Sequence, residues 1–259
     1  MLKVSIITVS FNSAKTIAST IDSVLSQDYP NIEYILVDGG STDGTVDIIQ
    51  QNQSRIGKWI SEKDRGMYDA MNKGIAMATG DVIGILNSDD VYMNTHVISE
   101  LIELMQSKRA QVVFADLILV DQFDDQKVLR YYDSGHFHPN KFKYGWMPAH
   151  PTVFVKRELY EAVGNFSTTY QIAADYEMLI RILAIQRARY AYLPKPVVRM
   201  RAGGVSTSGL SRNWILNQEI VRACKENGIY SNMAMLLLKL PFKLWGKVAG
   251  GRFNKRLHQ

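Results

Sequence analysis

The chain has 259 residues, of which 46% are hydrophobic and 21% charged, and this ordinary globular composition excludes a disordered protein. Its length allows one large domain or a domain with an appendage. The net charge is +5, and the single cysteine, Cys224, excludes a disulfide framework and any cysteine-based zinc site, which is consistent with a reducing cytosol.

Apolar runs and amphipathic stretches alternate through the first 116 residues. The predicted strands are 4–9, 33–37, 57–61, 82–86 and 111–115, and the predicted helices are 13–27, 43–52, 67–79 and 96–108. This alternation is typical of an α/β fold, a mainly parallel sheet with helices on both faces. Asn12 or Ser13 is the natural N-cap of the first helix. The chain begins with no secretory signature, so we expect a cytoplasmic protein.

The periodicity is lost from Leu117 to Met147, where aromatic and charged residues crowd together. Long irregular segments inside compact domains are usually functional, so we interpret this one as a substrate-facing excursion from the sheet. The alternative is an edge hairpin with ordinary aromatic packing. Regular structure then returns, with strands at 151–155 and 189–193 and helices at 156–163, 174–187 and 211–227.

The last predicted segment, 233–249, is apolar but interrupted by lysines and by Pro241. It is too short and too charged to span a bilayer, which needs about 20 predominantly apolar residues. Lysines beside Leu, Phe and Trp fit a helix that lies in the lipid headgroup layer. The alternative is a helix that packs on the main domain or forms an oligomer contact. We therefore divide the chain into a domain at 1–208 and a helical, basic appendage at 209–259.

The sequence IGILNSDDV, at 83–91, ends a buried strand abruptly in Asn87, Ser88, Asp89 and Asp90. Open α/β sheets bind their ligands at the carboxyl ends of strands. Adjacent carboxylates repel each other in a low dielectric, and a divalent cation offsets that repulsion. The sequence therefore predicts a metal site here. The alternative is an Asx-rich turn that uses these residues for local hydrogen bonds alone.

Two further aspartates lie at ends of predicted elements, Asp38 after the second strand and Asp175 at the start of the helix at 174–187. Asp38 opens the sequence DGGSTDGT, in which Ser41 or Thr42 can cap the next helix. The dinucleotide fingerprint G-x-G-x-x-G is absent, which disfavours a nicotinamide-dependent oxidoreductase.

Together these motifs resemble those of the inverting family 2 glycosyltransferases of the GT-A fold, and in particular bacterial enzymes that build O-antigen, capsule or exopolysaccharide repeats. The matching segments follow the family's order over roughly the first 200 residues, at 5–12, 37–45, 61–74, 86–90 and 174–177.

The resemblance implies a nucleotide-sugar site. The donor-binding residues would be Thr8, Ser10, Asn12, Asp38, Arg65, Asp69, Asn87, Ser88 and Arg201. By this similarity Asp38 accepts a hydrogen bond from uracil, and Arg201, in a segment that closes over the donor, offsets diphosphate charge. Asp89, with a contribution from Asp90, would bind Mg²⁺ or Mn²⁺. No histidine matches the family's further metal ligand, so the third ligand stays undecided. The alternative for Arg65 is an exposed helix face, with an ion pair between Asp69 and Lys73.

The resemblance also implies that Asp175 is the catalytic base, which removes the proton of the acceptor hydroxyl as that oxygen attacks the sugar. The alternative for Asp175 is an ordinary first-turn carboxylate favoured by the helix dipole. His150 and Trp146 are candidate acceptor contacts, and the alternative for His150 is a structurally satisfied side chain.

The expected reaction moves a hexose or N-acetylhexosamine from a UDP-sugar to a glycan acceptor, such as a saccharide on polyprenyl diphosphate, in cell-surface polysaccharide synthesis. The basic tail places the expected protein on the cytoplasmic face of the bacterial inner membrane. The alternative function is a non-catalytic nucleotide- or glycan-binding module on the same fold. Nucleic-acid binding is disfavoured because the basic residues lie beside apolar ones.

Overall fold

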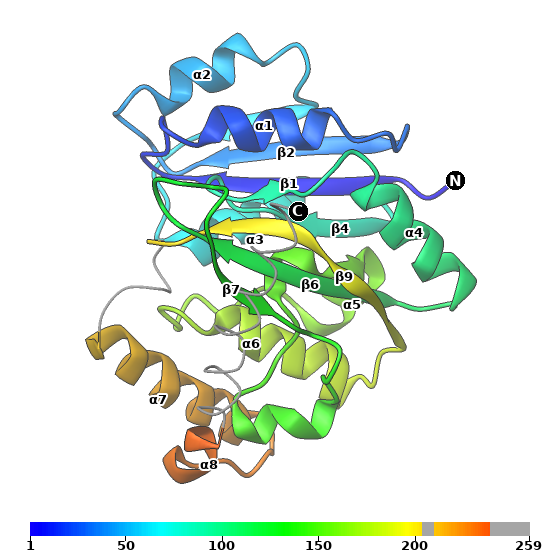
Figure 1. The fold of residues 1–259 in the computed structure, drawn as a ribbon, viewed down its shortest axis with the longest axis vertical. Coiled ribbons are helices and arrows are strands. Elements are labelled where there is room, and N and C mark those ends of the chain that lie inside the picture. The colour runs from blue at the N-terminus through cyan, green and yellow to red at the C-terminus, as the bar shows by residue number, and fades with distance from the viewer. Residues whose placement is uncertain (204–209, 239–259) are drawn as a thin grey trace.

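The computed structural model describes residues 1–203 and 210–238. One sheet forms its centre, with the strand order β3-β2-β1-β4-β8-β6-β9-β5, and β7 pairs with β6 at the side of this path (Figure 1). The strands are β1 (Val4–Ser10), β2 (Ile32–Asp38), β3 (Lys58–Ser61), β4 (Val82–Ile85), β5 (Val91–Tyr92), β6 (Val112–Val120), β7 (Val128–Tyr132), β8 (Phe154–Lys156) and β9 (Tyr190–Arg201).

The first four strands are parallel to one another, and β6 is parallel to β9. The antiparallel pairs all involve the later strands, namely β4 with β8, β6 with β8, β6 with β7 and β5 with β9. The sheet is thus mixed but mainly parallel. The predicted α/β class is confirmed, and the predicted strands 33–37, 57–61 and 82–86 match β2, β3 and β4 to within one residue.

Helices cover both faces of this sheet (Figure 1). They are α1 (Ile17–Leu25), α2 (Thr45–Gln51), α3 (Met67–Met77), α4 (Val97–Ser107), α5 (Arg157–Val163), α6 (Ala174–Leu179), α7 (Leu210–Glu226) and α8 (Met233–Leu237). A π-helical stretch, Ile180–Ile185, follows α6, and two short 3₁₀ helices lie at Pro139–Tyr144 and His150–Thr152. The predicted helix at 174–187 is therefore divided into two parts of different winding.

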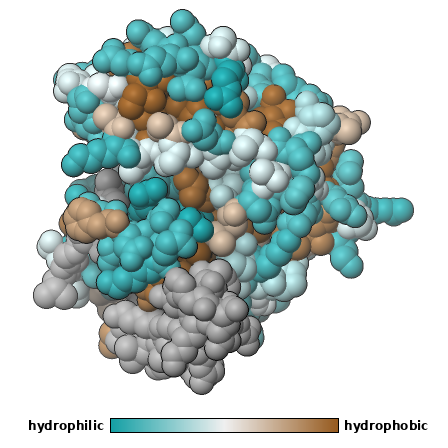
Figure 2. Space-filling view, turned by 45° about the horizontal axis from the view of Figure 1, so that its top comes forward, coloured by the Kyte–Doolittle hydropathy of each residue, from teal (hydrophilic) through white to brown (hydrophobic). Residues whose placement is uncertain are grey.

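Two hydrophobic cores result, one on each face. Along β1, Ile7 packs with α3, α6 and α7, whereas its neighbour Ile6 packs with α1, α2 and α4. Because successive strand residues point to opposite faces, every residue of β1 is buried. Each fully buried isoleucine stabilises the fold by roughly 1.5–3 kcal/mol. On the face shown in Figure 2, hydrophilic side chains cover most of the surface, and hydrophobic residues show between them.

The segment after Leu117 is not the irregular excursion that we predicted. β6 continues to Val120 and turns back into β7, so the alternative, an edge hairpin, is correct for this part. A buried carboxylate inside β6 hides the strand from a hydropathy pattern. Asp116 accepts hydrogen bonds from the hydroxyls of Tyr131 and Tyr192, at 2.6 and 2.8 Å, and this satisfies its charge within the sheet.

The predicted strand at 189–193 was also too short, since β9 runs to Arg201. The strand contains prolines at 194 and 196, which are unusual inside a strand because proline donates no hydrogen bond. The pairing of β9 with β6 shifts register near Asp116, which accommodates both prolines. Arg201 therefore lies at the end of a strand, whereas 204–208 of the predicted closing segment lie outside the described residues.

Two predicted helix starts were too early and wrongly capped. α1 begins at Ile17 and α2 at Thr45, and neither has a side-chain N-cap hydrogen bond. Asn12 and Ser41 cap no helix because they bind each other's loops, as described below.

The C-terminal helices share the core of the main domain. Ile220 and Cys224 of α7 and Leu236 of α8 are buried in the hydrophobic cluster of α3 and α6. The predicted boundary at 208 lies in the segment 204–209, which is outside the described residues. The basic tail from Lys239 onward is also outside them. Within residues 1–203 and 210–238, no helix has the length and apolar character needed to cross a bilayer.

Candidate active site

The carboxyl ends of β1, β2 and β4 lie at the same edge of the sheet, because these strands are parallel neighbours. The loops after β1 and β2 are joined by hydrogen bonds. The Asn12 backbone N–H donates to Ser41 Oγ at 2.8 Å, and Thr42 N–H donates to Asn12 Oδ1 at 3.0 Å. Ser13 Oγ lies 2.8 Å from Ser88 Oγ and so links this pair of loops to the loop after β4. The three loops form one hydrogen-bonded unit.

Asp38 is the anchor of that unit. Its side chain is fully buried and accepts five hydrogen bonds, from Ser10 Oγ, Gly40 N, Ser41 N and Oγ, and Ser61 Oγ, at 2.5–3.1 Å. Burial raises the pKa of this carboxyl, but the hydrogen bonds from these serines outweigh it and hold the pKa below its usual range. Asp38 is therefore ionised and its lone pairs are occupied by the protein. Its contact with a nucleobase stays a prediction.

The other strand-end residues differ in their exposure. Thr8 is fully buried and accepts a hydrogen bond from Tyr34 Oη at 3.1 Å, and Ser10 is buried against Asp38. Sequence reasoning did not select Phe11, which directly follows β1 and is 63% exposed. An aromatic residue between Ser10 and Asn12 is the signal that would have selected it, because an exposed ring at a strand end offers a stacking surface.

Asp89 and Asp90 follow β4, as the sequence predicted. Asp90 is buried, and both its Oδ1 and the Oδ1 of Asn87 lack a hydrogen-bond partner. Burial and the adjacent Asp89 raise the pKa of Asp90 well above its usual range. Burial also raises the pKa of Asp89, and the charge of Arg201 opposes this rise. Two buried oxygens without partners, beside a second carboxylate, fit a hard divalent cation.

A complete cage of protein ligands is not present. In the part of the chain that the structure describes, no group of three or more histidine, cysteine, aspartate or glutamate side chains is placed to hold a metal ion. Any cation bound by Asp89 and Asp90 would need further oxygens from a ligand or from water, as is usual for Mg²⁺.

Asp175 lies in the first turn of α6 and is half-buried. Its Oδ1 accepts a hydrogen bond from the Tyr176 backbone N–H at 2.8 Å, and the Tyr68 hydroxyl lies 3.4 Å away. Burial raises the pKa of Asp175, and His150 lowers it in part. Burial lowers the pKa of His150 itself, so its imidazole is neutral at pH 7. The structure thus brings together two predicted residues, Asp175 and His150.

Glu219 of α7 fixes the turn that precedes Asp175. Its carboxylate accepts hydrogen bonds from the backbone N–H groups of Gln171, Ile172 and Ala173, at 2.7–2.9 Å. The Glu219 side chain is buried. Sequence reasoning missed this residue, and no local signal could have found it, because one glutamate on an amphipathic helix is ordinary.

The predicted donor-side helix shows the ion pairs of the alternative interpretation. Arg65 is 82% exposed, and its Nη2 lies 3.0 Å from Asp69 Oδ1. Lys73 Nζ lies 2.8 Å from Glu62 Oε1 and 3.9 Å from Asp69 Oδ2. The exposed face and the pair between Asp69 and Lys73 are therefore present, and donor contacts by Arg65 and Asp69 stay predictions.

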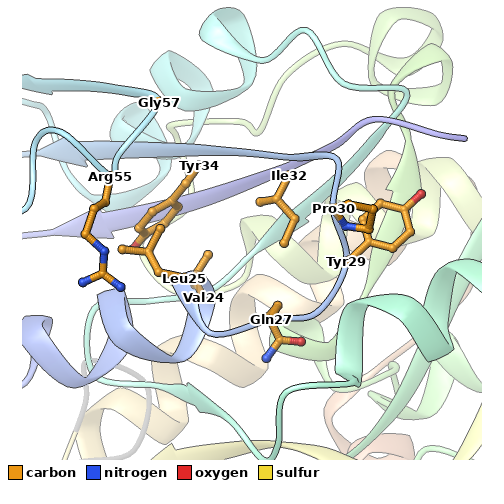
Figure 3. A pocket seen from close by; sticks show the side chains of 9 residues that line it. All are labelled: Val24, Leu25, Gln27, Tyr29, Pro30, Ile32, Tyr34, Arg55 and Gly57. Atoms are coloured by element: carbon orange, nitrogen blue, oxygen red, sulfur yellow. The ribbon is translucent and has the colours of Figure 1, made fainter.

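Trp146 is half-buried and precedes Met147, whose carbonyl accepts a hydrogen bond from the Tyr132 hydroxyl at 2.9 Å. This contact ties the segment between Trp146 and His150 to β7. Figure 3 shows a different place, a pocket of about 220 Å³ beside α1 and β2. Gln27 and Arg55 are among its lining residues, and none of the predicted site residues lines it.

Comparison with known proteins identifies the family. Residues 5–172 match the model described as glycosyl transferase family 2. An uncharacterized glycosyltransferase of Mycobacterium tuberculosis is 32% identical over 183 residues, which cover 69% of this chain and 68% of that protein. A PGL/p-HBAD biosynthesis glycosyltransferase of Mycobacterium bovis is 26% identical over 248 residues, which cover 94% of this chain and 91% of that protein. The chain belongs to glycosyltransferase family 2.

Solved structures with the same fold agree with this. The S. aureus TarS 1–349 complex with UDP-GlcNAc superposes with a TM-score of 0.63 at 18% identity, over 86% of this chain and 66% of that one. The mannosyltransferase PcManGT of Pyrobaculum calidifontis, in complex with GDP-Man and Mn²⁺, gives 0.62 at 19% identity, over 98% and 87%. The chain spans 39% of a longer TarS structure. The predicted GT-A fold is confirmed.

Proposed function

We propose that this glycosyltransferase moves a hexose or N-acetylhexosamine from a UDP-sugar to a glycan acceptor, with inversion at the transferred carbon. The observation that carries the proposal is the half-buried Asp175, beside His150, in a chain whose β4 is followed by the half-buried Asp89 and the buried Asp90. One carboxylate that accepts a proton is what an inverting transfer needs, because the acceptor oxygen attacks from the side opposite the leaving diphosphate.

The donor would bind at the ends of β1, β2 and β4. The hydrogen-bonded loops fix the backbone there before any ligand arrives, and fixed groups lose little entropy on binding. The related folds of TarS and PcManGT bind UDP-GlcNAc and GDP-Man, so both bases have precedents in this architecture. We propose UDP for this chain.

A Mg²⁺ or Mn²⁺ ion would be held by Asp89, by Asp90 and by the partnerless Oδ1 of Asn87. When bound, the cation supplies positive charge to the departing diphosphate. Arg201, whose charge reaches both carboxylates, would add a second positive group at the same end of the site. Asn87 in the place of a carboxylate removes one negative charge, so we expect weaker metal binding than three carboxylates would give.

Asp175 would accept the proton of the acceptor hydroxyl. Its raised pKa makes it a stronger base than an exposed aspartate, and general bases of this kind contribute about 10²- to 10⁴-fold to rates. The neutral His150 beside it can donate a hydrogen bond to the acceptor or to the carboxylate. Trp146, in the same segment, would bound the acceptor pocket.

The proposed acceptor is a saccharide on polyprenyl diphosphate at the inner face of the bacterial cytoplasmic membrane. The basic residues of the tail support this placement, since each lysine or arginine near an anionic leaflet contributes about 1 kcal/mol to binding. α8 packs against the core through Leu236, whereas Leu237 and Leu238 are exposed.

The test is the variant Asp175→Asn, assayed for UDP release from a panel of UDP-sugars with Mn²⁺. We expect transfer to fall at least about 10³-fold while UDP binding is retained, because the amide keeps the shape and loses the basic oxygen. Glu158→Gln is the matched control, an exposed carboxylate in the first turn of α5, and should retain full activity. Unchanged turnover in Asp175→Asn would remove this residue as the base.

A further inference from the structure

Arg130 of β7 has no counter-charge among residues 1–203 and 210–238. It lies opposite Leu119 of β6 and is half-buried. Its guanidinium carbon lies 5.1 Å from the centre of the Tyr132 ring, and its Nε is buried with no hydrogen-bond partner. Among the residues that the structure describes, no carboxylate lies within ion-pair distance of it; Arg199, by contrast, pairs with Asp125 at 3.4 Å.

Burying a guanidinium in this way costs free energy. A guanidinium removed from water loses hydration, and the ring face of Tyr132 replaces only part of it, because a π-face accepts no in-plane hydrogen bond from Nε. Arginine presents a planar fork of donors that matches a phosphate or carboxylate. An anion from a ligand would complete the group.

The surroundings of Tyr132 indicate which part of the proposed site Arg130 belongs to. The Tyr132 hydroxyl donates to the Met147 carbonyl, so this ring lies against the segment that carries Trp146 and His150. Burial raises the pKa of Tyr132 to about 12, and both Arg130 and Asp175 act on it electrostatically. Arg130 thus lies over the ring of a tyrosine that also responds to the charge of the proposed base.

The diphosphate of the donor is a poorer match. Asp89 and Asp90 respond to the charge of Arg201, so the proposed metal end of the site has a cation of its own. Arg130 instead lies over Tyr132, whose hydroxyl is bound to the segment that carries the proposed acceptor contacts Trp146 and His150.

We propose that Arg130 binds an anionic group of the acceptor, a phosphate or a carboxylate, next to the hydroxyl that is glycosylated. This inference rests on the proposed transfer function and narrows its acceptor class. An acceptor of this kind combines a sugar hydroxyl with an oxyanion close to it, as in a sugar linked to a lipid through phosphate or in a uronic acid.

The experiment measures binding to the full chain saturated with UDP and Mn²⁺, so it needs no turnover. The probes are two pairs that differ in charge, farnesyl phosphate with farnesol and octyl glucuronide with octyl glucoside. The proteins are the wild type, Arg130→Gln, Arg130→Lys and the control Lys127→Gln. Lys127 is on the same hairpin, pairs with Asp121 at 3.4 Å, and removes the same unit of charge when substituted.

We expect the wild type and Lys127→Gln to prefer one anionic probe over its neutral partner by at least tenfold. Arg130→Gln should lose that preference and Arg130→Lys should retain part of it. The pair that shows the preference identifies phosphate or carboxylate as the anion. Equal preference in the wild type and Arg130→Gln, or no preference in the wild type, would overturn the proposal.

Two further readouts separate other causes. If Arg130→Gln weakens UDP binding and leaves the anion preference intact, the guanidinium serves the donor and the proposal is wrong. If the wild type fails to bind UDP at all, the proposed function fails first. Unfolding by urea identifies a variant that has lost its fold. If Arg130→Gln has lost it, the proposal is tested with Arg130→Lys, which keeps the charge and the stem over Tyr132 and should retain only part of the anion preference.

Discussion

The region of β1 to β3 and the region of β7 and α6 satisfy their polar groups in opposite ways. On the side of β1 to β3, Asp38 accepts five hydrogen bonds and the loops after β1 and β2 bind each other. On the side of β7 and α6, the buried Nε of Arg130 has no hydrogen-bond partner in the described part of the chain, and Asp175 is half-buried with few donors. The difference suggests that the donor side is organised in advance, whereas the acceptor side holds groups that a ligand would satisfy.

The loop after β4 lies between these extremes, and it offers the largest test. We expect Asp89→Ala to lower transfer by about 10³-fold, since a group that stabilises the leaving charge contributes on this scale. UDP affinity in the variant should no longer depend on Mn²⁺, whereas EDTA should weaken UDP binding to the wild type. Titration calorimetry with UDP measures both.

Glu103→Ala is the control for that variant, because Glu103 is exposed on α4 and remote from the strand ends. If Asp89→Ala and the wild type bind UDP equally well with and without Mn²⁺, the cation site lies elsewhere.

Asp38→Asn tests whether the donor side is held by its own hydrogen bonds. The asparagine side chain carries two N–H donors, and it would face the five N–H and O–H groups that now donate to the carboxylate. We therefore expect a loss of roughly 3 kcal/mol in the free energy of unfolding. Because the folded pKa of Asp38 lies below its unfolded value, its contribution is present above the unfolded pKa and is lost as the pH falls through the folded pKa. Urea unfolding at pH 7 and at pH 3 measures this.

The variant should therefore lose less stability than the wild type between these two pH values. A variant as stable as the wild type at pH 7 would show that the five hydrogen bonds do not hold the loop.

Glu219→Gln examines the acceptor side, where one side chain of α7 holds three backbone N–H groups before Asp175. Glu219 touches no proposed substrate atom, so it is a positioning residue. Small displacements of a reacting group cost up to about 10²-fold, and we expect kcat to fall about tenfold with the KM for the donor unchanged. Glu219→Asp should restore less than the wild-type rate, since the shorter side chain does not reach all three N–H groups. A change in donor KM with constant kcat would contradict this role.

The sequence predicted the strands β2, β3 and β4 and their polar ends better than the hairpin of β6 and β7, for a physical reason. Asp38, Asp89 and Asp90 follow apolar parallel strands, and both the strands and their polar ends are local in sequence. The hairpin of β6 and β7 was hidden because Asp116 is satisfied by Tyr131 and Tyr192, which lie 15 and 76 residues away.

Contacts across the chain also explain what sequence reasoning missed in the site. Glu219 acts on a turn 46–48 residues before it, and nothing in its local pattern shows this. Asn12 looked like a helix cap, but the loop after β2 supplies its partners. The residue types predicted the chemistry of the site, and the tertiary contacts decided which groups are satisfied.

The smallest expected effect concerns the pH dependence of transfer. Burial raises the pKa of Asp175, so the acid limb of kcat/KM should lie above that of an exposed aspartate, and activity should rise with pH as the carboxyl loses its proton. Tyr68 lowers this pKa through its hydroxyl, which donates to the Ile172 carbonyl at 2.5 Å and lies 3.4 Å from Oδ1 of Asp175. Tyr68→Phe should therefore move the limb to higher pH, modestly because a hydrogen bond of this length is weak.

The limb is measured from pH–rate profiles of both proteins with saturating Mn²⁺. Tyr160→Phe, a substitution of a buried tyrosine on α5, is the control that should leave the limb in place. Two results would mean that a group other than the half-buried Asp175 controls the rate: a limb that moves to lower pH in Tyr68→Phe, or a wild-type limb at the pH expected of an exposed aspartate. The contrast drawn above would then not hold for the region of β7 and α6.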